Sequence, residues 1–201
     1  MGRLIIVAFT TLDGVVEDPD GSDHSPGGGW AMRHGPQGVA GDKFRLGPIL
    51  GQGTLLFGRR TWEHFSTLWP GRDDPFSLAM NAADKAVVTH RDLDPTTWTG
   101  SRVVDRPLTD WVEDRLPTGD VVVIGSQSVV RALAEEDLVD EYRLLTFPVA
   151  LGTGRRLFTT STQLDLVSTE QVGLAVLSVL STRGPQDART PICEKHLSSS
   201  N

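Results

Sequence analysis

The stretch that decides the fold is Thr54-Leu55-Leu56-Phe57-Gly58-Arg59-Arg60-Thr61. Its apolar first half indicates a strand buried on both faces. Gly58 permits a sharp turn and a close approach to a ligand because it has no Cβ. A helix expected from Thr61 to Phe65 would offer its first N–H groups to an anion, and Arg59, Arg60 and Thr61 add donors suited to phosphate oxygens. An ordinary tight turn with solvated arginines is the alternative.

The same order of features recurs in Asp120-Val121-Val122-Val123-Ile124-Gly125-Ser126-Gln127-Ser128. A buried strand again meets a glycine, and a helix is expected from Val129 to Glu136. Ser126 and Ser128 would donate to an anion or, alternatively, only cap their own helix. Two such junctions in one chain favour a diphosphate ligand more than either does alone.

A third basic strand end follows Ala86-Val87-Val88, where the sequence reads Thr89-His90-Arg91. Arg91 is suited to pair with a nucleotide 2′-phosphate, whereas a solvated strand end is the alternative. The G-x-G-x-x-G fingerprint is absent, so a standard Rossmann site is not supported.

The remaining pattern predicts an α/β fold. Helices are expected at 39–50 and 108–116, and the segment 18–29 is expected to be an exposed loop because Gly, Pro, Asp and Ser dominate it. The last segments are consecutive strands without intervening helices, which indicates antiparallel additions to a mostly parallel, mixed sheet. The further strands are expected at 4–9, 15–17, 102–104, 142–149, 163–172 and 174–182. Residues 1–183 are expected to form one domain and residues 184–201 a flexible tail.

Composition narrows the function classes. The net charge of −7 argues against general nucleic-acid binding, which requires a basic surface. No apolar run is long enough to span a bilayer. The lone Cys193 excludes an intramolecular disulfide, and the scattered histidines form no zinc pattern, so we expect a cytoplasmic protein without a metal.

In order along the chain, these motifs resemble the dihydrofolate reductase-like superfamily, and within it the RibD C-terminal-like reductases of riboflavin biosynthesis. The likeness runs from about Arg3 to Thr182. Its motifs are Thr11-Leu12-Asp13-Gly14, Gly58-Arg59-Arg60-Thr61-Trp62-Glu63, Val123-Ile124-Gly125-Ser126, Asp137-Leu138-Val139-Asp140-Glu141-Tyr142, Pro148-Val149-Ala150-Leu151-Gly152-Thr153-Gly154 and Arg156-Leu157-Phe158. The family usually has a second glycine where this chain has Ser126.

The resemblance implies a three-layer α/β/α fold, often dimeric, with NADPH across the strand ends. For the cofactor phosphates, it implies contacts with Gly58, Arg59, Arg60 and Thr61, and for the pyrophosphate with Ile124, Gly125, Ser126, Gln127 and Ser128. The 2′-phosphate would face Thr89, His90 and Arg91. The nicotinamide would lie near Ala8 and Phe9.

Three further residues are candidates for the substrate side. The segment from Asp18 to Trp30 corresponds in position to the mobile active-site loop of folate reductases, so Trp30 would close over substrate or only anchor the loop. Asp42, on the helix expected at 39–50, corresponds in position to their catalytic acid, with a surface aspartate as the alternative. Asp13 is a candidate substrate residue, although Asp-Gly favours a structural turn.

The function that follows is an NADPH-dependent reductase that transfers hydride to a C=O or C=N group of a small pterin-like or flavin-precursor-like substrate. The alternative is an NADP-binding module without turnover, acting as a sensor or a partner-binding dimer. A homodimer is expected by resemblance, with neither a nucleic-acid nor a membrane partner.

Overall fold

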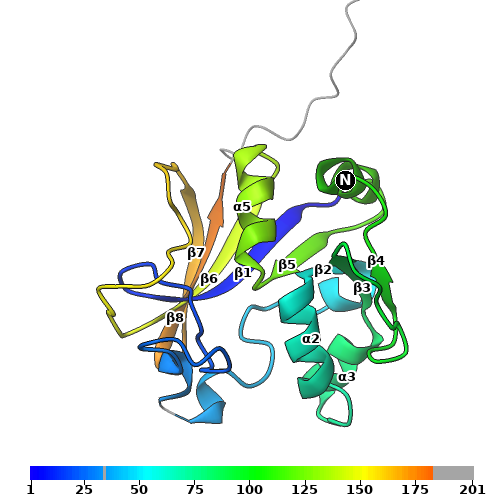
Figure 1. Ribbon diagram of the computed structural model, residues 1–201. Coiled ribbons are helices and arrows are strands. Elements are labelled where there is room, and N and C mark those ends of the chain that lie inside the picture. Colours follow the sequence, from blue (N-terminus) through cyan, green and yellow to red (C-terminus); the bar gives the residue numbers. More distant parts are fainter. Residues whose placement is uncertain (34, 183–201) are drawn as a thin grey trace, which may run out of the picture.

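In the computed structural model, residues 1–33 and 35–182 are described, and they are built around one eight-stranded sheet in the order β4-β3-β2-β5-β1-β6-β8-β7 (Figure 1). The strands are β1 (Leu4–Thr11), β2 (Thr54–Gly58), β3 (Asp84–Val88), β4 (Ser101–Val103), β5 (Val121–Ile124), β6 (Glu141–Phe147), β7 (Asp165–Val172) and β8 (Ala175–Ser181). The tail expected at 184–201 lies outside the described residues.

The sheet is parallel from β4 through β6, and β8 and β7 then add to it in antiparallel pairs. The predicted mixed, mostly parallel sheet with antiparallel C-terminal strands is therefore confirmed. One consequence decides where a ligand can bind. Because the parallel strands point the same way, the carboxyl ends of β2, β5, β1 and β6 share one edge of the sheet.

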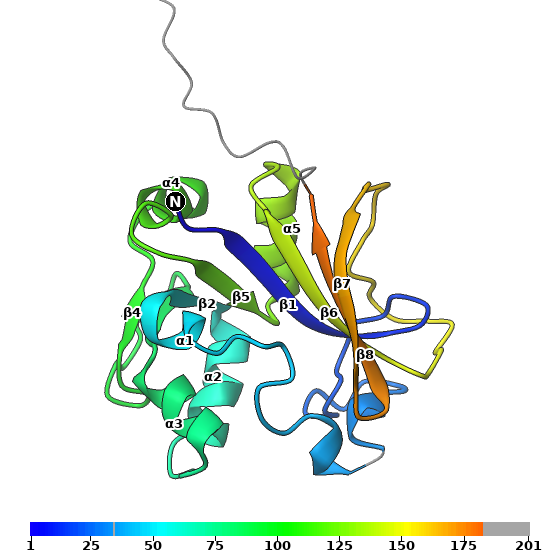
Figure 2. The same cartoon turned by 180° about the vertical axis from the view of Figure 1, so that it is seen from behind.

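Helices cover both faces of this sheet, which confirms the three layers. On one face, α4 (Leu108–Arg115) and α5 (Gln127–Glu135) contribute Val112 and Leu133 to a buried apolar cluster with Ile6 and Val123. On the other face lie α1 (Ile49–Gln52), α2 (Arg59–Leu68) and α3 (Pro75–Ala82). Figure 1 shows α5 in front of β1 and β5, and Figure 2, from behind, shows α1 on the opposite side.

The prediction of a helix at 39–50 is wrong, because only α1, four residues long, forms at the end of this range. Arg45 and Gly47 both have positive φ, and Pro48 follows them, so a continuous helix is interrupted there. The short 3₁₀ turns η1 (Trp30–Met32) and η2 (Pro36–Gly38) precede it. The structure also contains α3, which the sequence pattern did not predict. Asp74 caps it by accepting hydrogen bonds from the N–H groups of Phe76 and Ser77.

The loop at 18–29 is more ordered than its composition predicted. Asp18 is buried, and its carboxylate accepts hydrogen bonds from the backbone N–H groups of Asp23, at 2.9 Å, and Ser25, at 2.8 Å. A Cβ on Gly28 would approach this carboxylate to 2.2 Å, so the loop closes around it. The segment therefore folds around one buried carboxylate, which its composition does not predict, while the expected exposure holds for residues such as Ser22, His24 and Gly27.

Candidate functional site

The two predicted strand-glycine-helix junctions meet in space. β2 and β5 are neighbours in the sheet, and α2 and α5 begin directly after them. The Gly58 N–H donates to the Ser126 hydroxyl at 2.7 Å. The Ser126 hydroxyl and backbone N–H in turn donate to Thr61 Oγ1, at 2.9 and 3.2 Å. We call Gly58, Thr61, Gly125 and Ser126 the glycine junction, because these bonds make one unit of segments far apart in sequence.

The backbone of the second half explains its residue types. Gly125 has φ of +62°, and a Cβ there would meet Thr61 Cγ2 at 3.1 Å. Ser126 also has positive φ, 53°, a conformation that glycine adopts more easily. The resemblance placed a glycine at this position. In this chain the serine bears the backbone strain, and its hydroxyl ties the two junctions together.

Both helices leave their first N–H groups available. Ser126 does not cap α5, because its hydroxyl points to Gly58 and Thr61, so the alternative in which Ser126 caps its own helix is wrong. In the described part of the chain, neither α2 nor α5 has a side-chain cap at its N-cap residue. The N–H groups at the starts of the two helices thus converge on one edge of the sheet, an arrangement that attracts anions.

Arg59 connects the glycine junction to the third basic strand end. Its guanidinium donates to the Asp92 carbonyl at 2.8 Å, to Thr89 Oγ1 at 3.4 Å and to Glu63 at 2.7 Å. Thr89 Oγ1 also accepts the Arg91 N–H at 3.1 Å. Arg59, Thr89 and Arg91 therefore lie together. His90 is exposed beside them.

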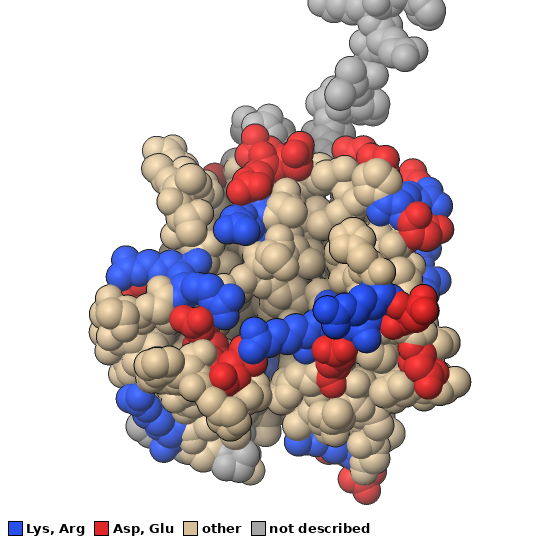
Figure 3. All heavy atoms as spheres, viewed as in Figure 1, with Lys and Arg blue, Asp and Glu red and all other residues tan. Residues whose placement is uncertain are grey.

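Arg60 points elsewhere. It forms an ion pair with Asp23 at 2.7 Å, and one turn later on α2 His64 lies 2.7 Å from Asp20. Both acids belong to the 18–29 loop, so this loop rests on the outer face of α2. Figure 3 shows Lys and Arg in a band, interrupted by Asp and Glu, between the N-terminal ends of α5 and α2.

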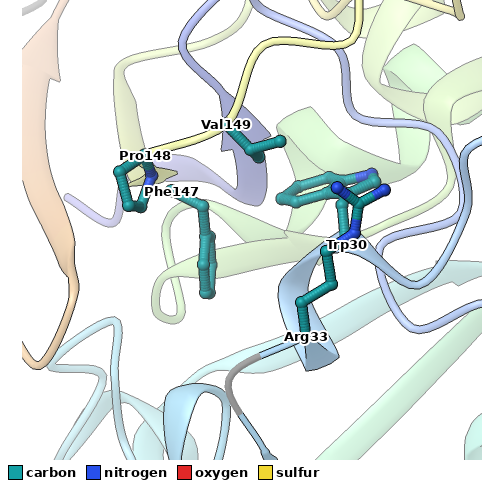
Figure 4. A pocket seen from close by; sticks show the side chains of 5 residues that line it. All are labelled: Trp30, Arg33, Phe147, Pro148 and Val149. Atoms are coloured by element: carbon teal, nitrogen blue, oxygen red, sulfur yellow. The ribbon is translucent and has the colours of Figure 1, made fainter.

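The ends of β1 and β6 carry aromatic rings instead of charges. Phe9 contacts Phe44 and Phe147, with ring centroids 5.1 and 5.8 Å apart, and Phe147 meets Trp30 edge-on at 5.6 Å. Beside these rings is a pocket of about 240 Å³ lined by Trp30, Arg33, Phe147, Pro148 and Val149, which we call the aromatic pocket (Figure 4). Ala8 and Phe9 lie on β1, between the glycine junction and this pocket in strand order.

Sequence reasoning found Trp30 but missed the rest of the aromatic pocket. Trp30 is 1% exposed, and its indole N–H donates to the Glu17 carbonyl at 2.9 Å, so it anchors the end of the loop. Phe147 and Val149 come from the end of β6, more than a hundred residues away. The only signal for them was the Pro148–Gly154 motif, which identifies a family and does not indicate a pocket.

Asp13 is a structural anchor in this arrangement. Its carboxylate accepts hydrogen bonds from Thr11 Oγ1 at 2.6 Å, from the Gly152 N–H at 2.7 Å and from the Leu151 N–H at 3.2 Å. These bonds, the one from Thr11 first, lower the pKa of Asp13 to about 2. A carboxylate held ionised by such donors is unsuited to deliver a proton near neutral pH.

Asp42 lies in a loop and not on a helix. Its two carboxylate oxygens accept hydrogen bonds from the N–H groups of Leu46 and Gly47, both at 2.7 Å. In the structure, Asp42 instead organises the turn that leads into α1.

Comparison with known proteins gives the family. A model of the RibD C-terminal domain matches residues 3–178. The chain belongs to the RibD C-terminal domain family. The uncharacterized proteins YwjB and YyaP of Bacillus subtilis (strain 168) are each 25% identical to it, over 87% and 89% of this chain and 94% and 93% of their own lengths.

Solved structures share the fold. A putative riboflavin biosynthesis protein from Shewanella sp. PV-4 superposes with a TM-score of 0.67 at 20% identity, over 90% of this chain and 98% of its own. RibD of Acinetobacter baumannii superposes with a TM-score of 0.57 at 16% identity, over 90% of this chain and 58% of its own. These likenesses show a shared fold. Membership in the RibD C-terminal domain family agrees with the predicted dihydrofolate reductase-like superfamily, and as a family of reductase domains it supports a general oxidoreductase role.

Two further observations concern metal binding and membrane crossing. Among residues 1–33 and 35–182, no group of three or more His, Cys, Asp or Glu side chains is arranged to hold a metal ion. Across the same residues, none of the helices has both the length and the apolar character needed to cross a membrane.

Proposed function

We propose that the protein is an NADPH-dependent reductase of a small substrate, with the glycine junction as its cofactor site. The observation that carries this proposal is the convergence of two uncapped helix N-termini, α2 and α5, around Gly58 and Gly125. The family is one of reductase domains that use a nicotinamide cofactor. A Cβ at Gly125 would lie 3.1 Å from Thr61 Cγ2, so glycine at this position lets the two helix N-termini pack closely, as a shared anion site requires.

The charged residues fit the choice of NADPH over NADH. Arg91 is exposed beside Thr89, and Arg59 is held in place by Glu63 and the Asp92 carbonyl. Guanidinium groups at this strand end are suited to bind the 2′-phosphate that distinguishes the two cofactors. Arg60, paired with Asp23, would bind phosphate only after leaving that acid.

When bound, NADPH would supply a hydride to a C=O or C=N carbon. The protein's own contribution is position and exclusion of water. Ala8 and Phe9 would border the nicotinamide, and the aromatic pocket would hold the substrate on the far side of Phe9. Among residues 1–33 and 35–182, no carboxylate lines this pocket, so we propose that the proton for the heteroatom comes from water and not from Asp13 or Asp42.

The test is a comparison of cofactors by isothermal titration calorimetry. Arg59→Ala combined with Arg91→Ala should weaken NADPH at least about tenfold and NADH far less, since charge-assisted bonds to the 2′-phosphate are lost. Arg72→Ala combined with Arg131→Ala is the matched control, because both arginines are exposed and neither follows a strand of the sheet. Equal losses for the two cofactors would overturn the assignment.

The alternative without turnover is favoured because no acid is found among the described residues that line the aromatic pocket. The reductase and the binding module are distinguished by measuring NADPH oxidation in the presence of pterin-like, flavin-precursor-like and small carbonyl compounds. Binding of NADPH without oxidation in any of these assays would favour the binding module.

We extend the proposal to a homodimer through β7. This strand ends the sheet, all its residues except Val172 are exposed, and Leu166 and Val167 are 63% and 62% exposed. An exposed apolar edge strand invites pairing, and a second copy offers the same edge. Light scattering should give twice the chain mass for the wild type and a monomer for Leu166→Lys with Val167→Lys. A monomeric wild type would refute the dimer.

A further inference from the structure

The 18–29 loop brings two carboxylates to α2, the helix that begins at the glycine junction. Asp23 Oδ1 lies 2.7 Å from Arg60 Nη2, and Asp20 Oδ2 lies 2.7 Å from His64 Nε2. Arg60 and His64 are four residues apart, so they share one face of the helix. The two contacts therefore fasten the loop to the side of α2 at its N-terminal end.

The loop presents Asp23 from a fixed backbone. The carboxylate of Asp18, a residue that is 5% exposed, accepts hydrogen bonds from the N–H groups of Asp23 and Ser25. The Asp18 carbonyl accepts the Gly29 N–H at 2.9 Å, which closes the loop at its other end. Because the Asp23 backbone is already held, its side chain meets Arg60 at a smaller cost in conformational entropy than a residue of a mobile loop would pay.

Arg60 is also in a position to bind a ligand anion. It is the second residue of α2, directly after Arg59, and in the described part of the chain α2 has no side-chain cap. A helix N-terminus of this kind attracts negative charge. A guanidinium binds a carboxylate or a phosphate with the same N–H donors. Asp23 therefore uses the donors of Arg60 that a phosphate would use.

The ion pair between Asp23 and Arg60 is weak enough to be displaced. The Arg60 side chain is 73% exposed and the Asp23 side chain 29%, and ion pairs this open to solvent contribute little free energy. A phosphate group at the glycine junction would also receive bonds from the first N–H groups of α2 and α5, which the Asp23 carboxylate does not reach from the loop. The loop therefore lowers the affinity for an anion without blocking its site.

We propose that the 18–29 loop is a built-in competitor of the cofactor. In the free protein the Asp23 carboxylate occupies Arg60, and a cofactor phosphate binds Arg60 by displacing this carboxylate. The proposal deepens the reductase assignment and rests on it, because Arg60 has this role only if phosphate binds at the glycine junction. The same loop leads into Trp30, so the competing segment adjoins a wall of the aromatic pocket.

A double-mutant cycle tests the competition, with the affinity for NADPH measured by isothermal titration calorimetry. Asp23→Asn should bind NADPH about two- to fivefold more tightly than the wild type, since an exposed ion pair sets the size of the gain. In the Arg60→Ala background the same substitution should leave the affinity unchanged, because the contested guanidinium is gone. The simple loss of one negative charge would instead tighten binding in both backgrounds.

Glu135→Gln is the matched control. Glu135 is also an exposed acid paired with an arginine, Arg131 at 4.0 Å, and it lies at the C-terminal end of α5, away from the glycine junction. This variant should bind NADPH as the wild type does. Circular dichroism and thermal melts show whether each variant is folded.

Two results would overturn the inference: an affinity for NADPH that is unchanged or weaker in Asp23→Asn, or an equal gain in the Arg60→Ala background. Inorganic pyrophosphate is titrated into the same variants. If NADPH binds and the cycle shows no coupling, the competition fails while the reductase assignment stands. If NADPH does not bind and the cycle holds with pyrophosphate, the cofactor assignment fails and the competition for an anion stands. Binding of neither anion would overturn both.

Discussion

The glycine junction and the aromatic pocket occupy the same edge of one sheet, yet they are built in opposite ways. The glycine junction consists of exposed or half-buried residues at two turns, held by hydrogen bonds between Gly58, Thr61 and Ser126. The aromatic pocket is a corner of the buried core, with Trp30 and Phe147 as its walls. We therefore expect substitutions in the first to change affinity for cofactor, and substitutions in the second to change stability.

The largest effect should come from Phe147→Ala. This side chain is 2% exposed and contacts both Phe9 and Trp30, so its removal leaves a cavity in the core. The free energy of unfolding should fall by about 3–5 kcal/mol, measured by urea denaturation. Val149→Ala is the control, since Val149 lines the same pocket but is only partly buried, and its loss should be smaller. Equal losses would show that the pocket is not part of the core.

Gly125→Ala should change affinity more than stability. The new Cβ would lie 3.1 Å from Thr61 Cγ2, so the glycine junction must shift, and we expect NADPH to bind at least about tenfold more weakly. Gly71→Ala is the matched control, because Gly71 also has positive φ, +84°, but a Cβ there meets nothing within 4 Å. Both variants should lose about 1 kcal/mol of stability from backbone strain. Unchanged NADPH binding in Gly125→Ala would contradict the cofactor assignment.

Two substitutions of Ser126 distinguish the stabilisation by its hydroxyl from the cost of its backbone strain. Ser126→Ala keeps the strain at φ of 53° and removes the partner of the Gly58 N–H, so it should lower stability by about 1–2 kcal/mol. Ser126→Gly loses the same hydroxyl but relieves strain of about 1–2 kcal/mol, so its stability should remain near that of the wild type. If the alanine variant proves as stable as the glycine variant, the strain argument is wrong.

The smallest effect is the pH dependence that Asp13 contributes to stability. Its pKa is about 2 in the folded protein and 3.8 ordinarily, so the unfolded chain binds the proton more tightly. The stabilisation is present above pH 3.8 and is lost as the pH falls toward 2. The difference in urea midpoint between the wild type and Asp13→Asn should therefore narrow over this window. A constant difference would show that the Asp13 bonds do not depend on its charge.

The difference between the glycine junction and the aromatic pocket also explains which features could be predicted from the sequence. The strands of the sheet and the two strand-glycine-helix junctions are encoded locally, by β-branched runs and by glycines at their ends, and these predictions were confirmed. The strand expected at 15–17 is wrong, because only Val15 pairs there, in an isolated bridge with Arg156. The aromatic pocket joins Trp30 and Arg33 to Phe147, and no local pattern reports such a contact. The helix expected at 39–50 fails for a different reason, because positive φ at Arg45 and Gly47 interrupts it despite its apolar spacing.

The loop at 18–29 shows a second limit. Its composition is typical of a solvated segment, but one buried carboxylate, Asp18, accepts enough backbone hydrogen bonds to organise it. The ion pair between Asp23 and Arg60 then directs an arginine toward this loop. The hydrogen bonds to Asp18 and the ion pair of Asp23 with Arg60 depend on where the backbone N–H groups and α2 lie in space, and a sequence motif alone does not give these positions.

The central claim, that NADPH binds at the glycine junction, is tested most directly by amide hydrogen exchange with and without NADPH. The uncapped first turns of α2 and α5 should exchange rapidly in the free protein, because open helix ends protect their N–H groups poorly. We predict that NADPH slows exchange in the segments 58–61 and 125–128 together. Unchanged exchange in both segments at NADPH concentrations that saturate the protein, or protection confined to other segments, would contradict the claim.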